Sequence, residues 1–185
     1  MALRGTLAGA VYGELLRHAE GELHRQLRPA VERRLAQIDV GAVASDAAGE
    51  TPIAVVARHL GVTAQNISTV VGLTQRATRA VGPRADPAPD QTDVAAVEQL
   101  LALLPGDPCL DAANILGLLV QTCVATPAIV DWARSGEAPA ATTRRFDANG
   151  DEIVVDLTGR PFGDGRHRCP GEAIARALIS GARVK

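Results

Sequence analysis

The chain has 185 residues and a formal net charge of −2 at pH 7, and it is 46% hydrophobic but only 2% aromatic. This length suits one domain with a buried core, and the near-neutral charge argues against a dedicated nucleic-acid surface. We expect one domain over residues 1–185, helical through residue 136, with a hairpin, a cysteine loop and a C-terminal helix over 137–185. The scarcity of aromatic side chains fits an alanine-rich helical core and, equally, a core whose volume is completed by a flat cofactor.

Three cysteines, Cys109, Cys123 and Cys169, lie far apart in the sequence and are odd in number. They imply no disulfide framework and fit a reducing compartment. The apolar start of the chain is interrupted by Glu14, and no small-residue cleavage pattern follows it. No segment approaches the ~18 uninterrupted apolar residues of a membrane span. We therefore expect a soluble, cytoplasmic protein with no membrane partner.

The first two-thirds of the chain predicts a succession of helices. Apolar residues at helical spacing predict a helix over residues 6–28 with a lapse near Gly21. Pro29 is expected to kink this helix or to begin a new one that reaches about Leu35. Further on, Thr51 is a predicted N-cap of a helix that ends at Gly61.

Three more helices and one linker are predicted in the next part of the chain. Thr63 is expected to cap a helix that runs to about residue 81, and residues 82–91, with three prolines and two aspartates, form a predicted linker. Thr92 is then expected to open a helix to residue 104. The most apolar segment, 111–132, predicts a central helix whose later half is bent by Pro127.

The character of the sequence changes after residue 136. Residues 142–146 and 152–157 flank Asp147-Ala148-Asn149-Gly150, which predicts a β-hairpin with Asn-Gly at its turn. The predicted fold class is therefore mainly α, with one small β-hairpin.

A glycine-rich loop, residues 162–171, places Cys169 at the start of a predicted C-terminal helix. Pro170 suits a first helical position, and Glu172 supplies the negative charge favoured in a first turn. Unpaired backbone N–H groups and the positive end of the helix dipole should favour the thiolate of Cys169. A thiolate in this position is a nucleophile or a metal ligand.

Several other interpretations of this part of the chain fail. Arg168 stands where a dinucleotide-binding fingerprint needs glycine, and no Gly-Lys-Ser/Thr sequence follows. Gly150 comes too early for an EF-hand calcium loop, and Cys169 with His167 lacks the second close pair that a zinc site needs. A cysteine nucleophile would need a base, for which His167 is the candidate. The residues alone leave open a nucleophile, a metal ligand and a simple helix-capping residue.

The loop resembles the heme-binding loop of the cytochrome P-450 family, which fixes Phe162, Gly165, a basic residue at 167, Cys169 and Gly171. The resemblance implies that Cys169 is the axial thiolate of the iron of heme b and that His167 meets a heme propionate. Phe162 would pack near the proximal side of the heme, and the two glycines would allow close approach of the backbone. Hydrogen bonds to the sulfur would tune the iron.

Other segments extend the resemblance. His24 and Arg28 are similar to the family's His-x-x-x-Arg, and they share a helix face on which they could hold one propionate, although an exposed basic face is the simpler interpretation. Arg144, with Arg145 as an equal alternative, stands where the family often has another propionate partner. The helix over 114–129 resembles the distal helix of the family. Val124 and Ala125 stand where the family has an acid and a threonine, and Thr126 follows one residue later, with Gln121 and Thr122 as nearby polar alternatives. Proton delivery would then use Thr126, water or the substrate itself.

The resemblance implies a shortened, divergent member of the family, a miniaturised P-450-like helical fold without the usual N-terminal sheet and terminal hairpin. The family's Glu-x-x-Arg pair is missing, since Glu137 is followed at that spacing by Ala140.

The expected function is that of a heme-thiolate oxidoreductase, a monooxygenase by family default, acting on a small organic molecule of specialised metabolism. Peroxide-driven or non-oxidative heme chemistry is the alternative that suits the missing acid. A non-catalytic activator of glycosyltransferases and a heme sensor or carrier are further alternatives. A redox partner and a homodimer complete the expectations.

Overall fold

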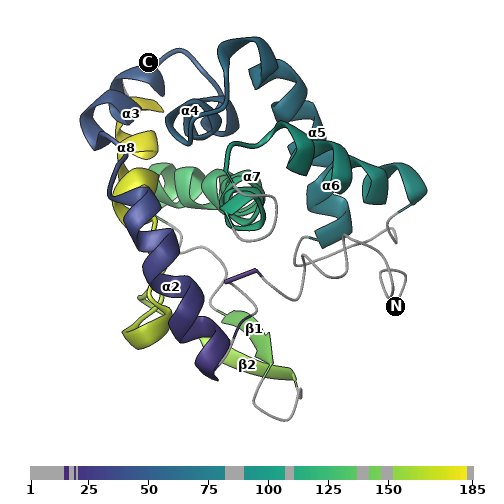
Figure 1. Ribbon diagram of the computed structural model, residues 1–185. Helices are drawn as coiled ribbons and strands as arrows, with labels where there is room; N and C mark the ends of the chain where they lie inside the picture. Colours follow the sequence, from purple (N-terminus) through teal and green to yellow (C-terminus); the bar gives the residue numbers. More distant parts are fainter. Residues whose placement is uncertain are drawn as a thin grey trace. The chain divides into compact units, whose positions relative to one another are not determined.

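A computed structural model describes residues 15–16, 19, 21–81, 90–106, 111–136, 142–146 and 152–182. The helices are α2 (Gly21–Leu35), α3 (Val40–Asp46), α4 (Pro52–His59), α5 (Ile67–Val81), α6 (Gln91–Leu103), α7 (Asp111–Ser135) and α8 (Glu172–Ala182) (Figure 1). Two short 3₁₀ turns, η1 (Ala64–Asn66) and η2 (Gly165–His167), and two strands, β1 (Thr142–Phe146) and β2 (Glu152–Asp156), complete the elements. The predicted fold class, mainly α, is confirmed.

The chain divides into two compact units. Unit 1 comprises residues 1–19 and 50–124, and unit 2 comprises residues 20–49 and 125–185. The long helix α7 belongs to unit 1 through Val124 and to unit 2 from Ala125 onward. The expectation of a single domain over the whole chain stays a prediction.

In unit 1, helix α5 packs against both α4 and α6. The predicted start of α4 is confirmed, because the Thr51 hydroxyl accepts from the Ala54 N–H at 3.4 Å. Its predicted end is confirmed too, because Gly61 takes a φ of +92° that suits glycine. Thr63 instead precedes η1 and makes no side-chain cap, so α5 begins only at Ile67.

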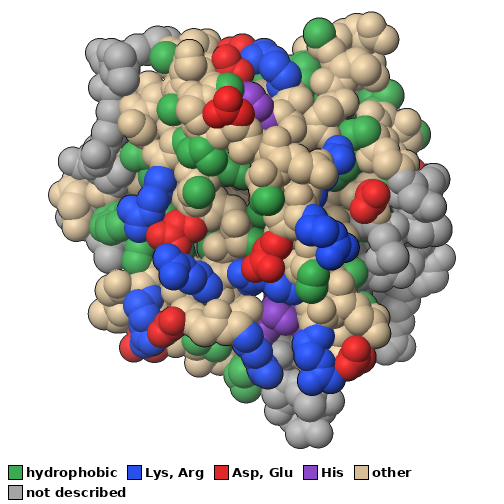
Figure 2. All heavy atoms as spheres, turned by 60° about the vertical axis from the view of Figure 1, so that its left-hand side comes forward, with side chains coloured by type: hydrophobic (Ala, Val, Ile, Leu, Met, Phe, Trp, Pro, Cys, Tyr) green, Lys and Arg blue, Asp and Glu red, His purple; other side chains and the backbone are tan. Residues whose placement is uncertain are grey.

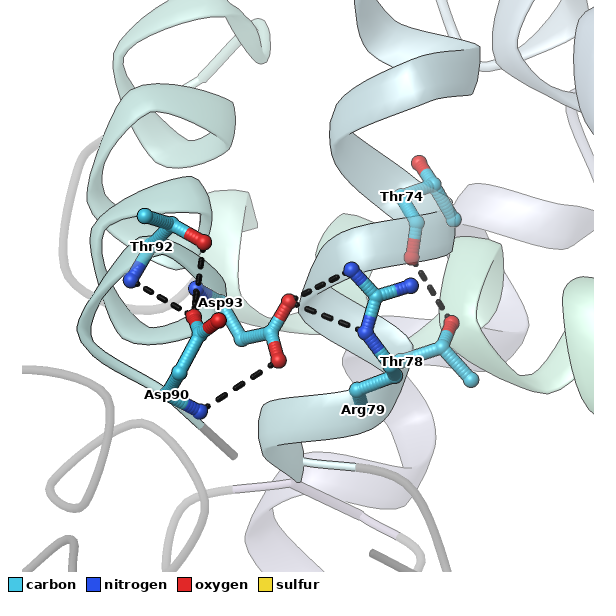
Figure 3. Close-up of polar contacts among 6 residues, drawn as sticks. All are labelled: Thr74, Thr78, Arg79, Asp90, Thr92 and Asp93. Atoms are coloured by element: carbon cyan, nitrogen blue, oxygen red, sulfur yellow. Dashed lines mark hydrogen bonds and ion pairs between the residues drawn. The ribbon is translucent and has the colours of Figure 1, made fainter. Parts of the chain in front are cut away.

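Helix α6 begins one residue earlier than predicted, at Gln91 rather than Thr92, and Asp90 caps it. The Asp90 carboxylate accepts from the backbone N–H groups of Thr92 and Asp93, and Asp93 returns a bond to the Asp90 N–H (Figure 3). This capping box satisfies the first backbone donors of the helix and so sets its start at Gln91. Asp93 also faces α5, where Arg79 donates to it from Nε at 3.0 Å and from Nη2 at 2.6 Å.

Helix α7 runs unbroken from Asp111 to Ser135 with Pro127 inside it. Its buried residues in unit 1 are almost all apolar, namely Ala112, Ala113, Ile115, Leu116, Leu119 and Val120. Among the described residues, the stretch Asp111–Trp132 is long and apolar enough to cross a membrane, a composition that buried core helices share. The cytoplasmic localisation stays a prediction.

The predicted helix over residues 6–28, which spans the boundary between unit 1 and unit 2 at residues 19 and 20, is wrong in part. Leu15, Leu16 and Ala19 are not helical, and α2 starts at Gly21, whose φ of +57° lies in the left-handed region and breaks the helical path. The rest of residues 6–20 lies outside the described residues. From Gly21 the helix then continues through Pro29 to Leu35 without a break.

Helix α3 was not predicted, and it packs against α8. Asp39 caps α3 by accepting from the N–H groups of Gly41 and Ala42. The contact with α8 is so close that a Cβ atom on Gly181 would lie 2.0 Å from the carbonyl oxygen of Ala44. The predicted hairpin is confirmed as an antiparallel pair of β1 and β2 in which Arg144 faces Val154 in register, and its turn lies outside the described residues.

Candidate functional site

The cysteine loop closes on itself through backbone hydrogen bonds. The N–H of Cys169 donates to the carbonyl oxygen of Phe162 at 2.7 Å, and the N–H of Arg168 donates to that of Gly165 at 3.1 Å. Gly163 and Gly165 take φ values of +70° and +56°, which L side chains rarely adopt. The two glycines therefore let the chain reverse between Phe162 and Cys169.

Cys169 lies half-buried just before α8. It packs against an apolar cluster made by Phe162 of the loop, Ile129 of α7 and Ile179 of α8. The N–H of Gly171 donates to the sulfur. A Cβ atom at position 171 would stand 4.0 Å from the sulfur, in ordinary van der Waals contact with it.

The expectation that the site favours the thiolate is wrong for the free cysteine. Burial raises the pKa of Cys169 above its ordinary value and outweighs the N–H of Gly171, which lowers it. The nearby Glu172 carboxylate raises this pKa further, and the positive charge of Arg28 lowers it. The helix terminus supplies the expected donor, but the apolar cluster removes water from the sulfur and penalises its charged form.

His24 and His167 come together. Their ring centroids lie 4.4 Å apart with the planes tilted by 53°, and His24 is buried on α2 while His167 is half-buried at the end of η2. Arg166 Nε donates to His167 Nε2 at 3.1 Å, which assigns the ring proton of a neutral His167 to Nδ1. The structure thus joins two of the residues that the sequence predicted as propionate partners.

Arg28 also reaches the loop, where its side chain contacts backbone carbonyl groups. Nη1 donates to the carbonyl oxygens of Arg168 and Arg166, and Nε pairs with Glu32 at 2.6 Å. For Arg144, the structure describes only the backbone in β1. Its predicted role, and that of Arg145, lie outside the described side chains.

Thr126 is buried on α7, next in sequence to Ala125, which packs against the cluster around Phe162. The proline that follows it has no N–H, so one turn of α7 lacks a backbone hydrogen bond at this point. Its predicted role in proton delivery stays a prediction.

A network of charges at the start of α8 was missed by sequence reasoning. Glu172 accepts from Arg168 Nε and Arg176 Nε, both at 2.9 Å, and the Arg176 guanidinium lies 4.8 Å from the centre of the Phe162 ring. The spacing of four residues between these charges was the available signal. Figure 2 brings forward the side of Figure 1 that carries α2, α3 and α8, and it shows basic and acidic side chains interspersed there, with histidine among them.

No three His, Cys, Asp or Glu side chains of the described ranges converge on one metal position. A heme iron with one protein ligand does not need such a group. Comparisons of the chain with protein-family models, with curated proteins and with solved structures found no match.

Proposed function

We propose that the chain is a heme-thiolate protein of cytochrome P-450 type in which Cys169 ligates the iron of heme b. The observation that carries the proposal is the folded cysteine loop: the Cys169 N–H closes it on the Phe162 carbonyl at 2.7 Å, and Phe162 is buried in the apolar cluster against which Cys169 packs. The N–H of Gly171, which lowers the pKa of Cys169, supports it. Backbone donors to a ligating sulfur and an apolar shell around it are the features by which proteins tune such a site.

The residues of unit 2 fit the proposed cofactor in chemical type. A half-buried thiol in an apolar cluster suits a flat apolar ring, and two imidazoles beside the loop suit its propionates. The raised pKa of Cys169 means that ligation would release a proton from the thiol, as is usual when a cysteine binds a metal.

Each residue has a separate part in this proposal. Cys169 binds the iron, and the N–H of Gly171 donates to the sulfur. Phe162 excludes water from the sulfur, while His24 and His167 hold the propionates. When bound, a heme with a thiolate ligand supplies oxidative chemistry, because electron donation from sulfur favours cleavage of the O–O bond.

We further propose a small organic molecule as the substrate and an oxidoreductase reaction as the default. The sequence favours one departure from that default, since Val124 and Ala125 stand where the family has an acid and a threonine. Thr126, the next residue along the chain, is then the candidate hydroxyl for proton delivery, and peroxide-driven or non-oxidative heme chemistry is the second candidate function. A redox partner and a homodimer are the remaining parts of the proposal.

The test is the absorption spectrum of the protein purified after expression with a heme precursor, reduced under carbon monoxide. We expect the red-shifted Soret band of a thiolate-ligated heme. Cys169→Ser should abolish this band, whereas Cys123→Ser, which changes a half-buried free cysteine on α7, should leave it in place. A protein that binds no heme, or whose thiolate band survives Cys169→Ser, would contradict the proposal.

A further inference from the structure

Arg28 makes contacts that a propionate role does not explain. Its Nη1 donates to the carbonyl oxygen of Arg168 at 2.6 Å and to that of Arg166 at 3.3 Å. Its Nε donates to Glu32 at 2.6 Å, and only 18% of the side chain is exposed. Both of these nitrogens are therefore engaged with protein groups, and two of the three acceptors belong to the cysteine loop.

The shorter of the two contacts with the loop, the one to the Arg168 carbonyl, acts on the peptide group that precedes Cys169. The carbonyl of that peptide accepts from Arg28, while its N–H, the N–H of Cys169, donates to the Phe162 carbonyl at 2.7 Å. A peptide group is planar, so bonds on both of its edges fix its orientation. That orientation sets the direction in which the side chain of Cys169 leaves the backbone. A charged donor at 2.6 Å is of the stronger class of hydrogen bond.

We propose that Arg28 is a positioning residue that fixes the Arg168–Cys169 peptide and so aims the cysteine side chain, rather than a ligand of a heme propionate. The inference rests on the proposed heme-thiolate function for its purpose, although the contacts themselves need no cofactor. It changes the role that the resemblance predicted for Arg28 and assigns the propionates to His24 and His167.

The first experiment uses the heme-free protein and measures amide hydrogen exchange. Arg28→Met should speed exchange of the Cys169 amide on the order of tenfold, because losing a hydrogen bond to a charged group weakens the closed loop by that factor or more. Arg25→Met is the matched control, since Arg25 lies on the same helix and pairs with Glu22 instead. Arg28→Lys, which can reach one carbonyl, should fall between the two.

Exchange at the other amides of unit 2, measured in the same variants together with their urea unfolding, separates a local effect from a general loss of stability. Faster exchange confined to residues 162–169, with the helices of unit 2 unchanged, supports the proposal. An unchanged Cys169 amide in Arg28→Met overturns it, and so does an equal rise at every amide of unit 2. A variant that does not fold is replaced by Arg28→Lys, for which the same two outcomes apply.

The second experiment compares binding of iron protoporphyrin IX with binding of its dimethyl ester, in which both propionates are blocked. If Arg28 acts on the loop, Arg28→Met weakens binding of both porphyrins by the same factor, whereas His24→Phe weakens only the free acid. If Arg28→Met weakens only the free acid, Arg28 is a propionate ligand and the inference is overturned. If the unmodified protein binds neither porphyrin, the proposed function fails, and hydrogen exchange alone decides whether Arg28 holds the loop.

Discussion

The imidazole rings of His24 and His167, with centroids 4.4 Å apart, connect helix α2 to the turn that leads into Cys169. His24 is buried, so its ring is part of the packing of unit 2 as well as a candidate ligand. On the same helix, Arg28 lies one turn later and contacts the same loop through its carbonyl groups. Two residues spaced four apart thus approach one loop with different chemistry.

His24 offers a test that separates packing from propionate binding. His24→Ala removes a buried ring, and we expect the heme-free protein to lose roughly 1–3 kcal/mol in urea unfolding. His24→Phe keeps a ring against His167 and should recover much of that loss. If the heme proposal holds, both variants should bind iron protoporphyrin IX about tenfold or more weakly, because each lacks a donor for the propionate. Recovery of binding in His24→Phe would contradict this role.

Glu172 predicts a sensitivity to acid at the start of α8. Its hydrogen bonds with Arg176 and Arg168 hold its pKa below the ordinary value of 4.5. A carboxyl with a lowered pKa in the folded state contributes stability above pH 4.5, and this contribution is lost as pH falls through the folded pKa. Glu172→Gln should therefore be less stable than the unmodified protein at neutral pH, and the difference should shrink in acid. Urea unfolding at several pH values measures it, and a constant difference would contradict the prediction.

Cys169 should be a slow nucleophile in the heme-free protein. Burial raises its pKa above the ordinary 9.0, so the folded state favours the thiol, and that preference is lost as pH rises through the folded pKa. In a Cys109→Ser, Cys123→Ser background, we expect iodoacetamide to react more slowly with folded than with urea-unfolded protein at neutral pH. The folded rate should also reach its plateau at higher pH. Equal rates and equal plateaus would show that the cluster does not shield the sulfur.

Local signals in the sequence predicted where helices and strands lie better than they predicted how these elements pack together. Thr51, Gly61 and the hairpin are local signals, and each was confirmed because a few neighbouring residues decide the outcome. Helix α6 starts one residue before the predicted Thr92 because Asp90 and Asp93 form a reciprocal cap at its first turn.

In the candidate site, too, local spacing was predicted from the sequence and contacts made by the folded chain were not. The sequence predicted that His24 and Arg28 would share a helix face, and both do approach the loop. It could not show that Arg28 contacts backbone carbonyls, because carbonyl direction depends on the folded turn and not on side-chain spacing. The raised pKa of Cys169 was missed for a related reason, since burial of the sulfur depends in part on Ile129 of α7, which is distant in sequence and meets the loop only in the fold.

Asp93 should be the most sensitive position at the contact of α5 with α6. Its side chain is only 6% exposed and accepts from Arg79, and it completes the capping box with Asp90. We expect Asp93→Ala to lower the free energy of unfolding by about 2–3 kcal/mol, because a partly buried ion pair and a cap are lost together. Asp90→Asn is the matched control and should cost under about 0.5 kcal/mol, since asparagine is an equally good N-cap. Equal losses in the two variants would contradict this assignment.

Two glycines in helices predict opposite effects of the same substitution. A Cβ atom on Gly181 would lie 2.0 Å from the carbonyl oxygen of Ala44 and 2.8 Å from the Cβ of Ala47, so Gly181→Ala must push α8 away from α3. Overpacking of this kind typically costs about 1–3 kcal/mol. Gly72 lies inside α5, and a Cβ there would meet nothing within 4 Å. Gly72→Ala should therefore stabilise the protein by about 0.5–1 kcal/mol, the helix preference of alanine over glycine. Urea unfolding of both variants checks the pair, and a stabilising Gly181→Ala would mean that α3 and α8 do not pack this closely in solution.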